Sequence, residues 1–215
     1  MRNPAVTAVV FDIGETLLDR TREYAAWADF FGVPAHTFSA VFGAMISRGS
    51  RVAEVIESFG SGEPYAELLA RRTDEGIGAR IEEQDLYPDV RDAISSLTAA
   101  GFTVGIAGNQ PAAVSGQLRD LELGADFIAS STDWGISKPA PEFFARAARE
   151  AHATVTETVY VGDQLDNDVL APRKAGMRTI RVIRGPWGYT TRDAAIEAEC
   201  IAVVRSLAEL PAALA

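Results

Sequence analysis

The segment that most constrains this chain is Val6–Leu18, in which an apolar run ends in an acid followed closely by a glycine. A run of Val, Ala and Phe is typical of a strand buried in a parallel sheet. Asp12 then lies at the strand end, and open α/β sheets bind ligands in the crevice outside the carboxyl ends of their strands. Aspartate is also common in turns. Taken alone, Asp12 fits either a turn or a ligand site.

Three later segments also place polar residues next to predicted strands or helices. One apolar strand ends at Gly108-Asn109, and another ends at Gly162-Asp163 with further acids behind it. Lys138 lies between them on a loop, directly before a Pro-Ala-Pro sequence that opens a helix and fixes the direction of the lysine. The acid at the end of the first strand therefore has companions on the later strand ends.

From Leu86 onward, short apolar runs alternate with segments in which apolar residues repeat every three or four positions. This alternation predicts an α/β fold, with a parallel sheet covered by helices on both faces and connected by right-handed crossovers. The expected strands are 103–107, 127–129, 159–161, 179–183 and 200–204, and the clearest helices are 112–121 and 142–151.

The segment between the first strand and this alternating region is predicted to be entirely helical. Tyr24, Trp27, Ala28 and Phe31 draw an apolar stripe with helical spacing, and further helices are expected around 38–46, 52–59 and 65–72. We therefore expect two domains: a core formed by residues 1–19 plus 85–215, and an inserted helical domain formed by residues 20–84.

The composition limits the partners and the compartment. The net charge of -10 argues against nucleic acid or an anionic membrane surface, because both reward clustered Lys and Arg. Cys200 is the only cysteine, so an internal disulfide is impossible and a reducing, cytoplasmic compartment is expected. The sequence has no charged-then-apolar leader and no run of 18 apolar residues, which argues against secretion and membrane spanning. No pattern indicates an oligomeric state.

The order of these motifs resembles the haloacid dehalogenase superfamily of hydrolases. The resemblance rests on Asp12 after the first strand, Gly108 after the second, Lys138 in Lys-Pro-x-Pro, and Asp163 in Gly-Asp-x-x-x-x-Asp, and it covers essentially the whole chain. It implies a Rossmann-like three-layer αβα core with an inserted α-helical cap. Such caps cover the strand ends, exclude water and contribute substrate contacts.

The resemblance also implies a chemistry. Asp12 would be the nucleophile that forms an aspartyl-phosphate, and Lys138 would pair with it and with the transferring phosphoryl group. The implied cofactor is Mg²⁺, which prefers oxygen ligands. Its implied ligands are Asp12, the backbone carbonyl of Gly14, Asp163 and Asp168. The implied substrate is a small phosphorylated metabolite, contacted by Ile13, Gly14, Gly108, Asn109 and Lys138.

This chain departs from the family pattern at two positions, and these departures leave more than one function open. Most phosphatases of the superfamily carry a second aspartate two residues after the nucleophile, as general acid and base, where this chain has Gly14. Such a group contributes about 10²–10⁴-fold to the rate. The second strand of the family ends in Ser or Thr, where this chain has Gly108; a hydrogen bond to a charged group contributes about 1.5–3 kcal/mol.

A Mg²⁺-dependent phosphatase is the favoured hypothesis, using another acid or a substrate whose leaving group needs little protonation. Glu15 is a candidate acid by proximity alone, and the favoured interpretation of Glu15 is a turn residue or a residue that supports the site. The first alternative is a dehalogenase- or phosphonatase-type hydrolase, since such members also lack the second aspartate and halide leaves without a proton. Dehalogenases need no metal, however, and the acidic cluster here is typical of a metal site. The second alternative is a catalytically weak protein that binds a phosphorylated ligand.

Overall fold

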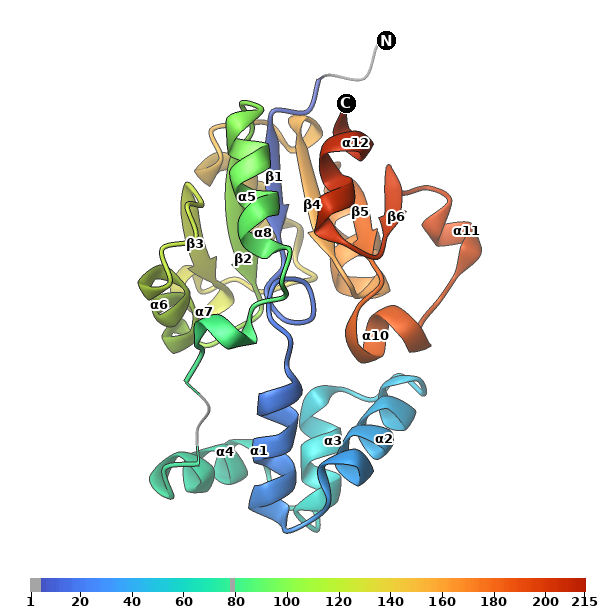
Figure 1. Cartoon of the computed structure of the whole chain (residues 1–215). Coiled ribbons are helices and arrows are strands. Elements are labelled where there is room, and N and C mark those ends of the chain that lie inside the picture. The colour runs from blue at the N-terminus through green and yellow to red at the C-terminus, as the bar shows by residue number, and fades with distance from the viewer. Residues whose placement is uncertain (1–4, 78–79) are drawn as a thin grey trace. The chain divides into compact units, whose positions relative to one another are not determined.

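The computed structural model describes residues 5–77 and 80–215 (Figure 1). The chain divides into two compact units, a core unit that runs up to Asp19 and resumes over Ile81–Ala215, and a helical unit formed by Arg20–Arg80. Within the described ranges, none of the helices is both long and apolar enough to cross a membrane.

The core unit is built on a six-stranded sheet in the order β3-β2-β1-β4-β5-β6, and all neighbouring strands are parallel. This arrangement confirms the predicted α/β Rossmann-like fold. The strands are β1 (Ala8–Phe11), β2 (Thr103–Gly108), β3 (Phe127–Ser130), β4 (Thr158–Gly162), β5 (Arg178–Val182) and β6 (Ala202–Val204).

Helices cover both faces of the sheet, and alternate side chains of β1 pack against the helices on opposite faces. Val9 and Phe11 pack in one apolar cluster with residues of α5 and α12, and Figure 1 shows these two helices over the same face of the sheet. Val10 packs in a second cluster with Phe143 and Phe144 of α8. The helices of the core unit are α5 (Val90–Ala99), α6 (Ala112–Asp120), α7 (Ser131–Trp134), α8 (Pro141–Glu150), α9 (Ala171–Lys174), α10 (Gly185–Thr190), α11 (Ala194–Glu197) and α12 (Leu210–Leu214).

The position of β1 within the sheet determines where Asp12 lies. Ala8 is in register with Thr103 of β2 on one side and with Thr158 of β4 on the other. The Asp12 N–H continues this pairing and donates to the Val161 carbonyl at 2.8 Å. Asp12 therefore leaves the sheet between the carboxyl ends of β2 and β4, where a topological switch point is expected to bind ligands.

The helical unit contains α1 (Thr21–Phe31), α2 (Ala35–Ile46), α3 (Val52–Phe59) and α4 (Tyr65–Asp74). Its core is aromatic: the rings of Tyr24 and Phe42 lie 4.7 Å apart between centroids, as do those of Phe38 and Phe59. The apolar spacing that predicted these helices is the same spacing that buries their inner faces. Arg72 is buried in this unit as well, although arginine is normally exposed.

Candidate active site

A buried ion-pair network forms where β1 ends. The Lys138 ammonium donates to Oδ1 of Asp12 and to Oδ1 of Asp168, at 2.6 Å in each case. All three side chains are almost completely buried. Residues that lie far apart in the sequence thus converge on one point at the carboxyl edge of the sheet.

The backbone of Lys138 is held by Asn109, which directly follows β2. The Asn109 side-chain oxygen accepts the Lys138 N–H at 2.8 Å, and its amide group donates to the Lys138 carbonyl at 2.9 Å. Both ends of the Asn109 amide are thus engaged with the lysine loop, so Asn109 orients Lys138. The substrate contact expected of Asn109 stays a prediction.

The charge of Lys138 is stabilised by its neighbours. Burial alone lowers the pKa of an ammonium group, but the carboxylates of Asp12 and Asp168 outweigh it and raise the pKa of Lys138 well above its ordinary value. The Tyr160 ring lies 5.3 Å from the ammonium, and its hydroxyl donates to the Ala107 carbonyl. Lys138 is therefore a permanent cation beside Asp12.

Asp163 follows β4 and is the most unusual carboxylate of the site. It is completely buried, and neither of its side-chain oxygens has a hydrogen-bond partner in the part of the chain that the structure describes. Burial raises the pKa of Asp163 well above its ordinary value, and the negative charges of Asp168, Asp12 and Glu15 raise it further. Native proteins rarely leave buried polar atoms unpaired, so Asp163 indicates a missing positive partner.

Asp168 lies on a π-helical turn, η3 (Leu165–Leu170), a geometry often found at functional sites. Its Oδ2 accepts the Gln164 N–H at 2.9 Å. Burial raises the pKa of Asp168 to about 6, even though Lys138 opposes the shift. Gly162 makes room for this side chain, because a Cβ at position 162 would lie 2.5 Å from it.

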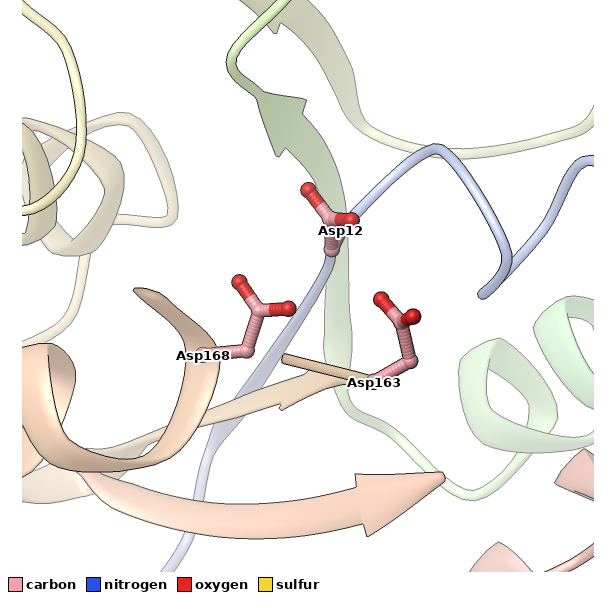
Figure 2. Close-up of side chains that lie close together, drawn as sticks. All are labelled: Asp12, Asp163 and Asp168. Atoms are coloured by element: carbon pink, nitrogen blue, oxygen red, sulfur yellow. The ribbon is translucent and has the colours of Figure 1, made fainter. Parts of the chain in front are cut away.

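The three carboxylates are arranged so that they can share one cation. Oxygen atoms of Asp12, Asp163 and Asp168 lie within 4.8 Å of one another, and Figure 2 shows the three side chains converging from separate segments. Three acids face a single ammonium, so the cluster carries excess negative charge. An all-oxygen donor set with unpaired oxygens fits a hard divalent cation. Asp166, in the same acidic run, is exposed and lies outside the cluster.

The two glycines that depart from the family pattern lie beside Asp12. Gly14 is buried in the loop after β1, together with Ile13, and forms an isolated bridge with Leu18. Gly108 ends β2, and a Cβ there would lie 2.6 Å from Oδ1 of Asp12. The space that a side chain would fill at position 108 is therefore occupied by the Asp12 carboxylate.

The sequence analysis did not connect Tyr87 and Arg184 with this site. The Tyr87 hydroxyl donates to Glu15 at 2.8 Å, and Arg184 donates to the Thr16 carbonyl at 2.8 Å. Neither residue belongs to a motif or an apolar stripe. The available signal was only Glu15 itself, a charged residue directly after Gly14 in the loop that follows β1.

Comparison with known proteins places this geometry among hydrolases. A family model described as haloacid dehalogenase-like hydrolase matches residues 6–176. The glyceraldehyde 3-phosphate phosphatase of Methanopyrus kandleri is 33% identical over 156 residues, which are 62% of this chain and 65% of that protein. The phosphoglycolate phosphatase of Nitrosospira multiformis is 29% identical over 95% of this chain and 93% of its own length. The match to the first of these relatives thus spans slightly less than two thirds of its length.

Solved structures share the fold over nearly the whole chain. A HAD hydrolase from Bacillus subtilis, solved bound to magnesium, has a TM-score of 0.73 at 21% identity and covers 98% of this chain and 99% of its own. The 2-haloacid dehalogenase of Pseudomonas syringae has a TM-score of 0.61 at 24% identity, covering 97% of this chain and 98% of its own. At these identities the similarity concerns the fold alone.

Proposed function

The chain belongs to the haloacid dehalogenase-like hydrolases, and we propose that it is a Mg²⁺-dependent phosphatase that acts on a small phosphorylated metabolite through an aspartyl-phosphate at Asp12. The observation that carries the proposal is the buried cluster of three carboxylates beside one lysine, in which Asp163 has no hydrogen-bond partner within residues 5–77 and 80–215. The phosphatase names of the M. kandleri and N. multiformis relatives support the same reaction class.

In this proposal a carboxylate oxygen of Asp12 attacks the phosphorus atom and the ester P–O bond breaks. The Asp12 side chain then carries the phosphoryl group until water attacks it and releases orthophosphate. Lys138 neutralises charge on both the nucleophile and the phosphoryl oxygens, in a site where burial strengthens such interactions. Mg²⁺ bound by Asp12, Asp163, Asp168 and the Gly14 carbonyl would add further positive charge next to the transferring group.

The absence of an acid at position 14 affects the leaving group. As the P–O bond breaks, an alkyl alcohol needs a proton, whereas a phenolate with a low pKa departs without one. Because Gly14 has no side chain, we expect aryl phosphates to be hydrolysed faster than alkyl phosphates. We also expect phosphoryl contacts to come from backbone groups of Ile13, Gly14, Gly108 and Asn109 rather than from a hydroxyl side chain.

We assign the Arg20–Arg80 unit as the cap of the enzyme, with residues 1–19 and the rest of the chain as the catalytic core. An insert after β1, entirely helical over its described residues, supports this assignment, as does the resemblance of the catalytic motifs. We further propose that the protein works in the cytoplasm, because its single cysteine suits a reducing compartment.

The test is orthophosphate release from a panel of alkyl and aryl phosphate esters, with Mg²⁺ and with a chelator. We expect metal-dependent release that Asp12→Asn abolishes. Asp166→Asn is the matched control, because it makes the same change at an exposed acid outside the cluster. If no ester releases orthophosphate and a 2-haloacid releases halide in the presence of chelator, the protein is a dehalogenase and not a phosphatase. Ligand-dependent thermal stabilisation without any turnover would indicate a binding protein.

A further inference from the structure

The loop that follows Asp12 adopts a conformation that its sequence does not favour. Glu15 has φ +57°, in the left-handed region that a residue with a side chain rarely adopts. Its side chain is nevertheless buried, with 3% of the residue exposed. Strained residues of this kind persist only where the surroundings fix them, and they cluster at functional sites.

Tyr87 and Arg184 fix this loop at three successive residues. The Tyr87 hydroxyl donates to Oε2 of Glu15 at 2.8 Å, and the Tyr87 backbone N–H donates to the Leu17 carbonyl at 2.9 Å. The guanidinium of Arg184 donates to the Thr16 carbonyl at 2.8 Å. The loop is therefore held by its side chain at position 15 and by its backbone at positions 16 and 17.

Further contacts hold Tyr87 and Arg184 in place. The Arg184 guanidinium lies 4.2 Å from the centroid of the Tyr87 ring and also pairs with Asp89. Asp89 accepts hydrogen bonds from the Ser206 hydroxyl and the Leu207 N–H, at 2.7 and 2.9 Å. Gly185 leaves room for Glu15, because a Cβ at position 185 would lie 2.5 Å from the Glu15 side chain.

We propose that the Glu15 carboxylate, through its hydrogen bond from Tyr87, is a positioning group that fixes the Gly14 carbonyl in the orientation needed for divalent-cation binding beside Asp12. This inference rests on the proposed function, in which the Gly14 carbonyl is a metal ligand. It assigns Glu15 no proton transfer. Groups that orient metal ligands typically change metal affinity or activity by about 10–100-fold when they are removed.

The Glu15→Gly variant distinguishes the positioning role of the Glu15 carboxylate from an effect of backbone strain at position 15. Glycine adopts a positive φ without strain, so the substitution relaxes the backbone while it removes the carboxylate. We expect Mg²⁺ affinity, measured by titration calorimetry on the full chain, to fall about 10-fold or more, and kcat to fall with it. Thermal stability without metal should not fall in parallel. Tyr87→Phe keeps the ring beneath Arg184 and should give the same loss of affinity.

The chain offers matched controls for both changes. Glu122 also has a positive φ, of 49°, but is exposed, so Glu122→Gly repeats the backbone relaxation away from the site. Tyr189 is 63% exposed, so Tyr189→Phe repeats the loss of a hydroxyl. Both controls should keep the wild-type Mg²⁺ affinity. Glu15→Gln retains an oxygen that can accept from Tyr87, so it should keep affinity within a few-fold.

Each outcome bears on the inference. Wild-type Mg²⁺ affinity in both Glu15→Gly and Tyr87→Phe would overturn it and leave the phosphatase proposal intact. If Glu15→Gly does not fold, Tyr87→Phe decides the question. Wild-type protein that binds Mg²⁺ but releases no phosphate from any ester would overturn the phosphatase proposal alone. Wild-type protein that binds no Mg²⁺ in calorimetry would overturn both.

Discussion

Both units bury charged side chains, but the Arg72 pair of the helical unit balances its charges and the Asp12, Asp163 and Asp168 cluster of the core unit does not. In the helical unit, Arg72 pairs with Glu23 at 2.8 Å, and the guanidinium lies 4.3 Å from the centroid of the Trp27 ring. The anion there has a cation within hydrogen-bond distance. In the cluster of the core unit, the Lys138 ammonium donates to Asp12 and Asp168, and the third carboxylate, that of Asp163, has no hydrogen-bond partner among the described residues.

The pKa shifts follow the same division. Burial raises the pKa of Glu23, but the hydrogen bond from Arg72 and the charges of Arg20 and Arg72 outweigh it, so that the pKa lies below its ordinary value. Asp163 moves in the opposite direction, because burial and neighbouring acids both act against its charge. A buried pair with matched charges is a structural element. A buried cluster with excess charge needs a ligand to become stable, and that need identifies the functional site.

The largest expected effect comes from removing the unpaired acid. Asp163→Asn should lower phosphate release at least about 10³-fold, because a bound cation supplies several kcal/mol of charge stabilisation in the transition state. The same variant should be more stable than wild type without metal, since it relieves repulsion among buried acids. Thermal melts with and without Mg²⁺ measure the stability of the variant and of wild type, with Asp166→Asn as the control. A less stable metal-free variant would contradict the excess-charge account.

Breaking the balanced pair should instead affect stability. Arg72→Leu leaves Glu23 without its main partner, and we expect a loss of about 3 kcal/mol, the lower end for a broken buried pair because Glu23 is partly exposed. Urea denaturation monitored by circular dichroism measures the loss. Arg51→Leu breaks an exposed pair with Glu54 in the same unit and should cost at most about 1 kcal/mol. Equal losses in the two variants would show that burial of the Arg72 pair has no energetic consequence.

Adding an acid to the unbalanced cluster sharpens the comparison. Gly14→Asp should raise turnover of alkyl phosphates by no more than about 10²-fold, which is the low end of the effect of a proton-transfer group. We expect the low end because the residues around position 14 pack against a glycine and not against an aspartate. Aryl phosphates, whose leaving groups need no proton, should gain less. Steady-state kinetics on paired alkyl and aryl esters tests the difference. An equal gain on both classes would mean that proton transfer does not limit the wild-type enzyme.

The smallest effect concerns the pH dependence of the helical unit. Because the pKa of Glu23 is lowered on folding, its contribution to stability is complete above the ordinary value of 4.5 and is lost as the pH falls through the lowered value. The difference in unfolding free energy between wild type and Glu23→Gln should therefore shrink below about pH 4.5, from at most about 1 kcal/mol. Urea titrations of both proteins at pH 7 and at low pH measure it. A difference in unfolding free energy between the two proteins that increases at low pH would contradict this prediction.

Much of the fold was predictable because it follows from periodicity. The run ending at Phe11 and the strand ending at Gly162 are buried at every residue, as the mostly apolar sequence of each strand predicts. The helix over Val52–Phe59 has the residues that its apolar spacing indicated. The convergence of Asp12 and Asp163 follows from parallel strands that end at one edge of a sheet.

The remaining features depend on contacts that the sequence pattern does not encode. The two hydrogen bonds between the Asn109 amide and the Lys138 backbone join segments that no local pattern connects. Arg72 and Arg181 are buried, against the general preference of arginine, because each meets a specific acid. The hydrogen bond between Tyr87 and Glu15 joins distant segments and leaves no local signal.

The place of β1 in the sheet also has a kinetic consequence. Its two partner strands begin at Thr103 and Thr158, so both sides of β1 stay unpaired until distant parts of the chain close on it. The entropy of closing such long loops must be lost before the pairing contributes, which slows folding relative to local contacts. The helical unit, whose contacts are nearer in sequence, can form earlier. Asp12 is thus translated early but reaches its place in the site late, and a chain interrupted before β4 would lack Asp163 and Asp168.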